Sequence, residues 1–168
     1  AIVLFEKSER VLDSIAVSPV RTYEYMLSKL FSIGIISVLV ASAIALFSGA
    51  ISITWHFIIG TFLCSCLFSA LGLIIAAGSI SLNGFIITTI PIEVIINIPA
   101  AIWLFGGRPG WLLIHPGVSM MELCTAYAGG KGNVLPALLI LAFWTLLAVL
   151  MANRSVKGML GEMGGIKL

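Results

Sequence analysis

The sequence predicts an all-α integral membrane protein. Its 168 residues are 60% hydrophobic and only 10% charged, whereas a typical soluble domain carries about 25% charged residues. No Asp, Glu, Lys or Arg occurs between Leu30 and Ile92, a run much longer than the roughly 20 residues that one membrane helix needs. Helices satisfy their own backbone hydrogen bonds in lipid, and the alternating pattern of a membrane β-barrel is absent from the sequence.

The chain opens with five apolar residues, 1–5, which we interpret as the end of a truncated span, so that the amino-terminal spans of the protein are missing. Residues 6–18 are amphipathic with the period of a helix that lies on a surface with one wet face. The apolar stripe includes Leu12. The charged stripe has the spacing i, i+3, i+4, i+7 and consists of Glu6, Glu9, Arg10 and Asp13.

A second helix is predicted to follow directly. Ser18 and Pro19 have the residue types of a helix N-cap and a first helical position. From Pro19 the helix is expected to continue through Arg21 and Glu24 into the first complete span. Residues 19–50 therefore form an elbow followed by a span that begins near Leu30.

Three further spans are predicted from hydropathy, over residues 53–78, 84–106 and 134–152. The connection 107–133 is apolar but broken, and it predicts short helices that fold into a re-entrant outer hairpin. Residues 153–168 are expected to form a cytoplasmic tail. The whole chain, 1–168, is thus predicted to be a single transmembrane domain.

The basic residues predict the orientation in the cell membrane. Seven of them lie before the first complete span or after the last one, whereas only Arg108 and Lys131 lie in the connection 107–133. Positive residues gather on the cytoplasmic side, so both ends of the chain are predicted to be cytoplasmic.

The third complete span carries a polar stripe, since Thr89, Glu93 and Asn97 follow the spacing i, i+4, i+8. A carboxylate near the bilayer centre costs at least about 2.5 kcal/mol, so it should face a bundle interior, a cavity or a subunit interface. One interpretation is a translocation path that attracts a cationic or zwitterionic substrate. The other is a structural hydrogen bond between helices, in a span that Pro91 and Pro99 kink.

At the outer mouth we expect Arg108, His115 and Glu122, either as an exit gate or as surface charges on a capped lid. Cys64, Cys66 and Cys124 are interpreted as small packing residues, and we predict neither a metal site nor a catalytic residue in this chain.

The segment "ERVLDSIAVSPVRTYEYMLSKL" resembles the region between the second and third spans of type-2 ABC exporter permeases, and within them it is most similar to fluoroquinolone export permeases. This resemblance implies that residues 6–18 are the coupling helix that docks on a separate ATPase subunit. It also implies a second permease subunit, either identical or different. The residues implied in ATPase coupling are Glu6, Glu9, Arg10, Leu12, Asp13, Ser18, Pro19, Arg21 and Glu24.

The first thirty residues contain four acidic and four basic side chains, a balance that suits a protein partner better than anionic lipid. The chain lacks the GxxxxGK[ST] phosphate-binding loop, so ATP and Mg²⁺ would be bound by the partner ATPase. The resulting prediction is the permease subunit of an ATP-driven exporter, which moves a small amphipathic or drug-like substrate by alternating access.

Two other functions are considered. A proton-coupled secondary transporter or channel would use Glu93 and would need no ATPase, which leaves the elbow unexplained. A membrane-embedded enzyme would need acids, histidines or a nucleophile on facing helices, and the sequence offers one intramembrane acid. A net charge of +2 with no basic cluster does not indicate nucleic-acid binding, whereas contact with membrane lipids is expected.

Overall fold

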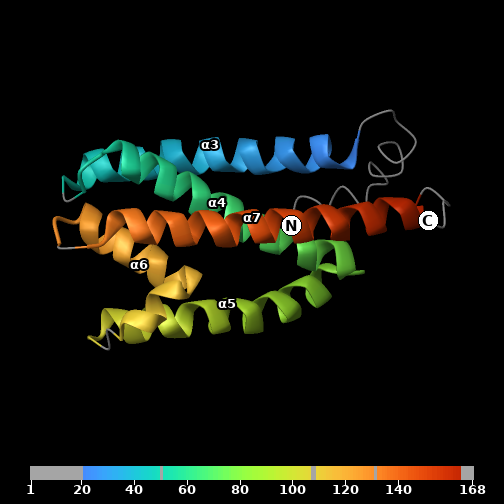
Figure 1. Ribbon diagram of the computed structural model, residues 1–168. Coiled ribbons are helices and arrows are strands. Elements are labelled where there is room, and N and C mark those ends of the chain that lie inside the picture. The colour runs from blue at the N-terminus through green and yellow to red at the C-terminus, as the bar shows by residue number, and fades with distance from the viewer. Residues whose placement is uncertain (1–20, 50, 107–108, 131, 164–168) are drawn as a thin grey trace.

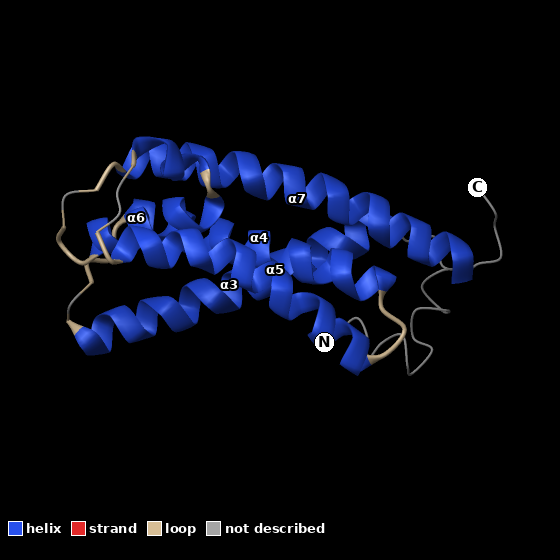
Figure 2. Cartoon of the chain, turned by 90° about the horizontal axis from the view of Figure 1, so that it is seen from below, coloured by secondary structure: helices blue, strands red, loops and turns tan. Residues whose placement is uncertain are grey.

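The computed structural model describes residues 21–49, 51–106, 109–130 and 132–163, and it describes side chains as far as Gly161. All regular structure within these residues is helical, as Figure 2 shows. In chain order the elements are α3 (Thr22–Ser48), α4 (Trp55–Gly78), α5 (Leu82–Leu104), the short 3-10 helix η1 (Gly110–Ile114), α6 (Pro116–Tyr127) and α7 (Val134–Met163).

Four of these helices, α3, α4, α5 and α7, are long and apolar enough to cross a membrane. The prediction of an all-helical fold with four helices of membrane length is therefore confirmed for the described residues. The predicted amphipathic coupling helix, residues 6–18, lies outside the described residues, as does the predicted end of a span at residues 1–5.

The start of the first span differs from the prediction. Arg21 has an extended backbone, with φ −73° and ψ 140°, so α3 begins at Thr22 and the prediction of one continuous helix from Pro19 is wrong. The carboxylate of Glu24 accepts a hydrogen bond from the backbone N–H of Arg21 at 3.2 Å. This bond gives the N–H group just before the helix a partner. The predicted cap residue Ser18 lies outside the described residues.

Small residues let α3 and α4 approach closely. Gly34 lies against the ring of Phe62, and a Cβ atom at this position would come within 2.5 Å of that ring. One turn further along α3, the hydroxyls of Ser37 and Ser65 share a hydrogen bond of 2.8 Å. Small side chains and interhelical hydrogen bonds are the usual means of packing helices in lipid, where no hydrophobic effect drives the contact.

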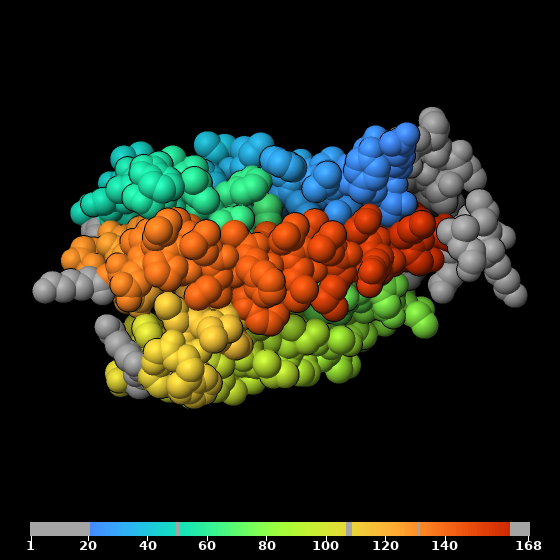
Figure 3. Space-filling view, viewed as in Figure 1, coloured from blue at the N-terminus to red at the C-terminus, as the bar shows by residue number. Residues whose placement is uncertain are grey.

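The centre of the bundle is formed by α4 and α7, with α3 packed on α4 (Figure 1). The hydroxyl of Thr145 in α7 donates to the carbonyl oxygens of Leu141 at 2.8 Å and of Leu63 in α4 at 3.2 Å. On the face of the molecule seen in Figure 3, α7 runs across the front, with α3 on one side and α5 on the other.

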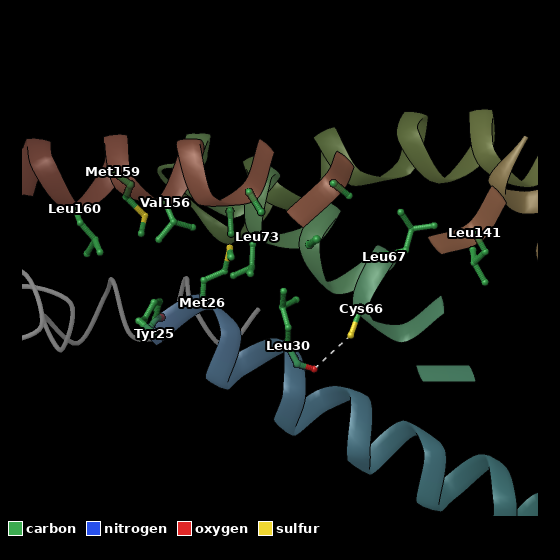
Figure 4. Close-up of a cluster of buried hydrophobic side chains, with 14 of the residues drawn as sticks. Tyr25, Met26, Leu30, Cys66, Leu67, Leu73, Leu141, Val156, Met159 and Leu160 are labelled. Atoms are coloured by element: carbon green, nitrogen blue, oxygen red, sulfur yellow. Dashed lines mark hydrogen bonds between the residues drawn. The ribbon is translucent and has the colours of Figure 1, made fainter. Parts of the chain in front are cut away.

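Helix α7 is longer than predicted. The sequence suggested a span of 134–152 followed by a tail, but the helix continues to Met163 because its far end has a partner to pack on. Val156, Met159 and Leu160 are buried in the same apolar cluster as Tyr25 and Met26 at the start of α3, as Figure 4 shows. A helix of 30 residues is about 45 Å long, more than the roughly 30 Å of a hydrocarbon core.

Candidate functional site between α4 and α5

The predicted polar stripe lies on α5, the helix with the least buried span of the four. The hydroxyl of Thr89 donates to the carbonyl oxygen of Phe85 at 2.7 Å, and the amide of Asn97 donates to the carbonyl oxygen of Glu93 at 2.8 Å. Each of these side chains therefore makes a hydrogen bond along the helix itself. Among the described residues no donor contacts the Glu93 carboxylate, which is exposed.

A cavity of about 200 Å³ lies between α4 and α5, and Thr89 and Glu93 are its two polar lining residues with side-chain oxygens. The remaining walls come from α4 and α5 and are apolar: Phe68, Leu71, Gly72, Ile75, Phe85, Ile92 and Ile96. Asn97 does not line the cavity. The structure thus brings two of the three residues of the stripe together beside one cavity.

Gly72 helps to keep this cavity open. Small residues in a membrane helix usually mark close helix packing, but no heavy atom lies within 4 Å of the position that a Cβ of Gly72 would occupy. Gly72 therefore serves no close contact, since no neighbouring side chain fills the space. Gly60 in the same helix does lie at a close contact, because its Cβ would lie 2.6 Å from the hydroxyl of Tyr127 and 3.2 Å from Leu123.

The cavity exists because α5 is held at its two ends and packs only sparsely on α4 between them. At the Leu82 end, the residues 79–81 form a short connection to α4, and α5 curves back toward it in Figure 1. Ser79 is buried there and its hydroxyl donates to the carbonyl oxygen of Ile75 at 2.8 Å. Ser81 caps α5 by accepting a hydrogen bond from the N–H of Gly84 at 3.2 Å.

At the Leu104 end, α5 is held by Glu122 of α6. This carboxylate is only 4% exposed. One oxygen accepts a hydrogen bond from the indole of Trp103 in α5 at 3.1 Å, and the other accepts from the backbone N–H of Asn133, just before α7, at 2.9 Å. Glu122 therefore connects three helices, and both of its oxygens are used inside the protein.

A glycine completes the contact between α6 and α5. A Cβ at Gly117 would collide with the backbone carbonyl oxygen of Ile96, so only glycine permits this approach. Beside it, Trp103, Leu112 and Val118 form a small buried cluster that joins α5, η1 and α6. In the sequence, the isolated acid Glu122 within an apolar stretch is the one sign of these contacts.

His115 caps α6. The N–H of Gly117 donates to its Nδ1 at 3.3 Å, and burial lowers the pKa of this imidazole below its ordinary value. His115 thus makes its hydrogen bond within the hairpin, Glu122 binds Trp103 of α5 and the backbone of Asn133, and Arg108 lies outside the described residues. The outer gate that was predicted from these three residues stays a prediction.

Two of the residues predicted to couple to an ATPase are described. Arg21 and Glu24 are both exposed at the start of α3, and the guanidinium of Arg21 donates to the hydroxyl of Tyr23 at 3.2 Å. The other seven lie within residues 1–20, outside the described part of the chain.

Cys66 is buried in the core, and its thiol lies 3.9 Å from the carbonyl oxygen of Leu30 (Figure 4). All three cysteines are free, and within the described ranges no three His, Cys, Asp or Glu side chains gather where they could hold a metal ion.

A family model described as "Fluoroquinolones export permease protein Rv2686c-like" matches residues 1–153 of the chain. No curated protein and no solved structure matches it.

Proposed function

The chain belongs to the Rv2686c-like family of fluoroquinolones export permeases, and from this we propose that it is the membrane-spanning permease subunit of an ATP-driven exporter. The family match and the four membrane-length helices support a transport role. Because the sequence has no phosphate-binding loop, the proposal assigns ATP and Mg²⁺ to a separate ATPase subunit. The chain itself is then a transport component and not an enzyme.

The observation that supports a translocation path is the position of Glu93. Its carboxylate lies on a membrane-length helix, at an apolar cavity that separates this helix from the centre of the bundle. An ionisable side chain at membrane depth is expensive and usually faces a cavity or a pathway. We assign Thr89 and Glu93 to the path of a small amphipathic or drug-like substrate, with Asn97 one turn further along.

Coupling is proposed to enter at the start of α3. Residues 6–18 would dock on the ATPase, and the first turns of α3 would carry the movement into the bundle. Tyr25 and Met26 pack on the far end of α7, so α3 and α7 would move together. Alternating access follows as a rigid-body rearrangement between two states, in a complex with a second permease subunit and two ATPases.

The hairpin of η1 and α6 is proposed to be re-entrant on the outer side. The indole of Trp144 donates to the carbonyl oxygen of Ile114, at the end of η1, at 2.8 Å. Trp144 lies ten residues after the start of α7, or about 15 Å along the helix axis. The end of η1 is therefore bonded to α7 at a point well inside this membrane-length helix, as a re-entrant hairpin requires. In this orientation both ends of the chain are cytoplasmic, in agreement with the distribution of basic residues.

A proton-coupled transporter is the second candidate, because Glu93 has no basic partner among the residues that line its cavity. The two functions are separated by purifying the full-length protein from its native membranes in mild detergent and identifying its partners by mass spectrometry. The exporter predicts a stoichiometric soluble protein with a GxxxxGK[ST] motif. Recovery of the chain without any such protein would contradict the exporter and favour proton coupling.

A further inference from the structure

We propose that the cavity between α4 and α5 binds the apolar part of an amphiphile that carries a positive charge, and that the Glu93 carboxylate pairs with this charge. The inference rests on the proposed transport function and adds the chemical class of the ligand. It concerns a site within one chain, so it can be tested without any partner subunit.

The charge of the site is the first argument. The nine residues that line the cavity include one acid and no Lys, Arg or His. The basic residues that the structure describes lie elsewhere: Arg21, Lys29, His56, His115, Arg154 and Lys157. An ionised carboxylate at membrane depth needs a counter-charge, and a cationic group on the ligand supplies one.

The local donors provide the second argument. Thr89 and Asn97 are the nearest polar side chains along the stripe, and both donate to backbone carbonyl oxygens of the preceding turn. Neither of the two donates a hydrogen bond to the carboxylate of Glu93. Glu122 differs in this respect, because its two oxygens accept hydrogen bonds from Trp103 and Asn133. Of these two carboxylates, only that of Glu93 remains available to an incoming group.

The size and walls of the cavity provide the third argument. Its volume of about 200 Å³ is below the roughly 300–1,000 Å³ of pockets that enclose a whole drug-sized ligand. It fits one ring or a short alkyl segment between Phe68 of α4 and Phe85 of α5. The rest of the ligand would extend past Glu93, on the exposed side of α5. A cation with an apolar body partitions into a bilayer, and it can reach this side from the lipid.

The experiment uses the full-length protein in lipid nanodiscs and two probes of equal shape. One is 4-phenylbutyltrimethylammonium, and the other is its uncharged isostere, in which a carbon atom replaces the nitrogen. Binding is measured by equilibrium dialysis, and empty nanodiscs give the blank for partition into lipid. The cation is expected to bind at least about tenfold more tightly than the isostere, because its interaction with a carboxylate adds binding free energy that the uncharged probe lacks.

Glu93→Gln keeps the shape of the side chain and should lower the affinity for the cation to that for the isostere. Gly72→Leu fills the cavity and should abolish the binding of both probes, and Gly72→Ala should weaken it. The matched control is Gly158→Leu in α7, where no heavy atom lies within 4 Å of the added Cβ and no change is expected. Thermal unfolding of each variant verifies that it is folded.

Equal affinity for the two probes, or a Glu93→Gln variant that keeps its preference for the cation, would overturn the proposal. The first result would mean that the cavity accepts any apolar group, such as a lipid chain or a helix of a second copy. Binding that survives Gly72→Leu would place the site elsewhere and would also overturn it. Failure of the exporter assignment is a separate result, because it depends on recovery of an ATPase and not on probe binding.

Discussion

At the scale of residues, the two carboxylates Glu93 and Glu122 have opposite surroundings. Glu122 is buried and accepts hydrogen bonds from Trp103 and from the backbone of Asn133, which fixes α6 between α5 and α7. Glu93 is exposed beside an apolar cavity. The first arrangement stabilises the structure, whereas the second leaves a carboxylate that no described donor contacts, as the proposed ligand site requires.

Glu122→Gln is expected to destabilise the protein by about 1–3 kcal/mol, because an amide has one acceptor oxygen and cannot accept the hydrogen bonds of both Trp103 and Asn133 as the carboxylate does. Unfolding of the purified protein in detergent measures this change. Glu93→Gln is the control and should change the free energy of unfolding by less than about 0.5 kcal/mol. Equal destabilisation by the two substitutions would contradict the difference in role.

His115 makes stability depend on pH. Its neutral imidazole accepts the N–H of Gly117, and burial lowers its pKa in the folded protein below the ordinary value of 6.5. The unfolded chain then binds a proton more readily than the folded chain. The stability that this group contributes is complete above pH 6.5 and is lost as the pH falls toward the lowered pKa. A proton would also place a positive charge at a helix N-terminus, which is unfavourable.

The test compares thermal unfolding at pH 7.5 and pH 5.5 for the natural protein and for His115→Asn. Asparagine is a good N-cap residue that does not titrate in this range. The variant is expected to lose less stability on acidification than the natural protein. An equal loss in both proteins would show that other groups cause the pH dependence.

At the scale of elements, α5 is held by the hairpin of η1 and α6 more than by α4. Trp103 and Gly117 provide this attachment, one by a hydrogen bond to Glu122 and the other by close approach to Ile96. Because the hairpin holds α5 at Ile96 and Trp103 and the helix packs only sparsely on α4, a cavity remains between α5 and α4. The position of Glu93 is thus a consequence of how the hairpin packs.

Gly117→Ala is expected to separate α6 from α5, because the added Cβ cannot fit against the carbonyl oxygen of Ile96. Such overpacking costs about 1–3 kcal/mol, measured as a loss of unfolding free energy in detergent. The matched control is Gly158→Ala in α7, where the Cβ meets no atom within 4 Å. The control should be neutral or stabilising, by up to about 1 kcal/mol, because alanine favours the helix. A Gly117→Ala variant as stable as the control would contradict the close contact.

At the scale of the whole molecule, the contact between the start of α3 and the end of α7 ties the two ends of the described chain together. Met26 and Val156 are almost fully buried in it. In the proposed exporter, a force applied before α3 would therefore reach α7 and, through the contacts of α7 with α6, the hairpin.

Charge reversal by Glu9→Arg combined with Asp13→Arg is expected to uncouple ATP hydrolysis from transport while the spans stay folded. The physical reason is that the coupling helix must dock on the ATPase in one fixed register, and its charged residues define that register. The measurement is the ratio of ATP hydrolysis to substrate efflux in proteoliposomes that contain both subunits. Lys157→Glu, at an exposed position in the far part of α7, is the control for altered charge. Normal coupling in the double variant would contradict the proposed role of residues 6–18 in docking on the ATPase.

Most of the fold could be predicted because each span is a local property of the sequence. Helix α4 begins at Trp55, two residues after the predicted start of its span, and it ends at Gly78, as the predicted span does. The ends of α3 and α7 were predicted less well. Arg21 is extended where a helix was expected, and α7 continues to Met163 because α3 covers its apolar face.

Hydropathy and helical spacing alone establish the membrane class, the helical structure and the polar stripe of α5, because they depend only on residues close together in the chain. The packed helices were needed to learn which polar residues lie at the cavity, that Glu122 bonds to Trp103 of α5, and that Gly72 faces open space while Gly117 faces a backbone. These properties depend on contacts between segments far apart in the sequence. Hydropathy and helical spacing do not record such contacts, because helices in lipid are positioned by their packing.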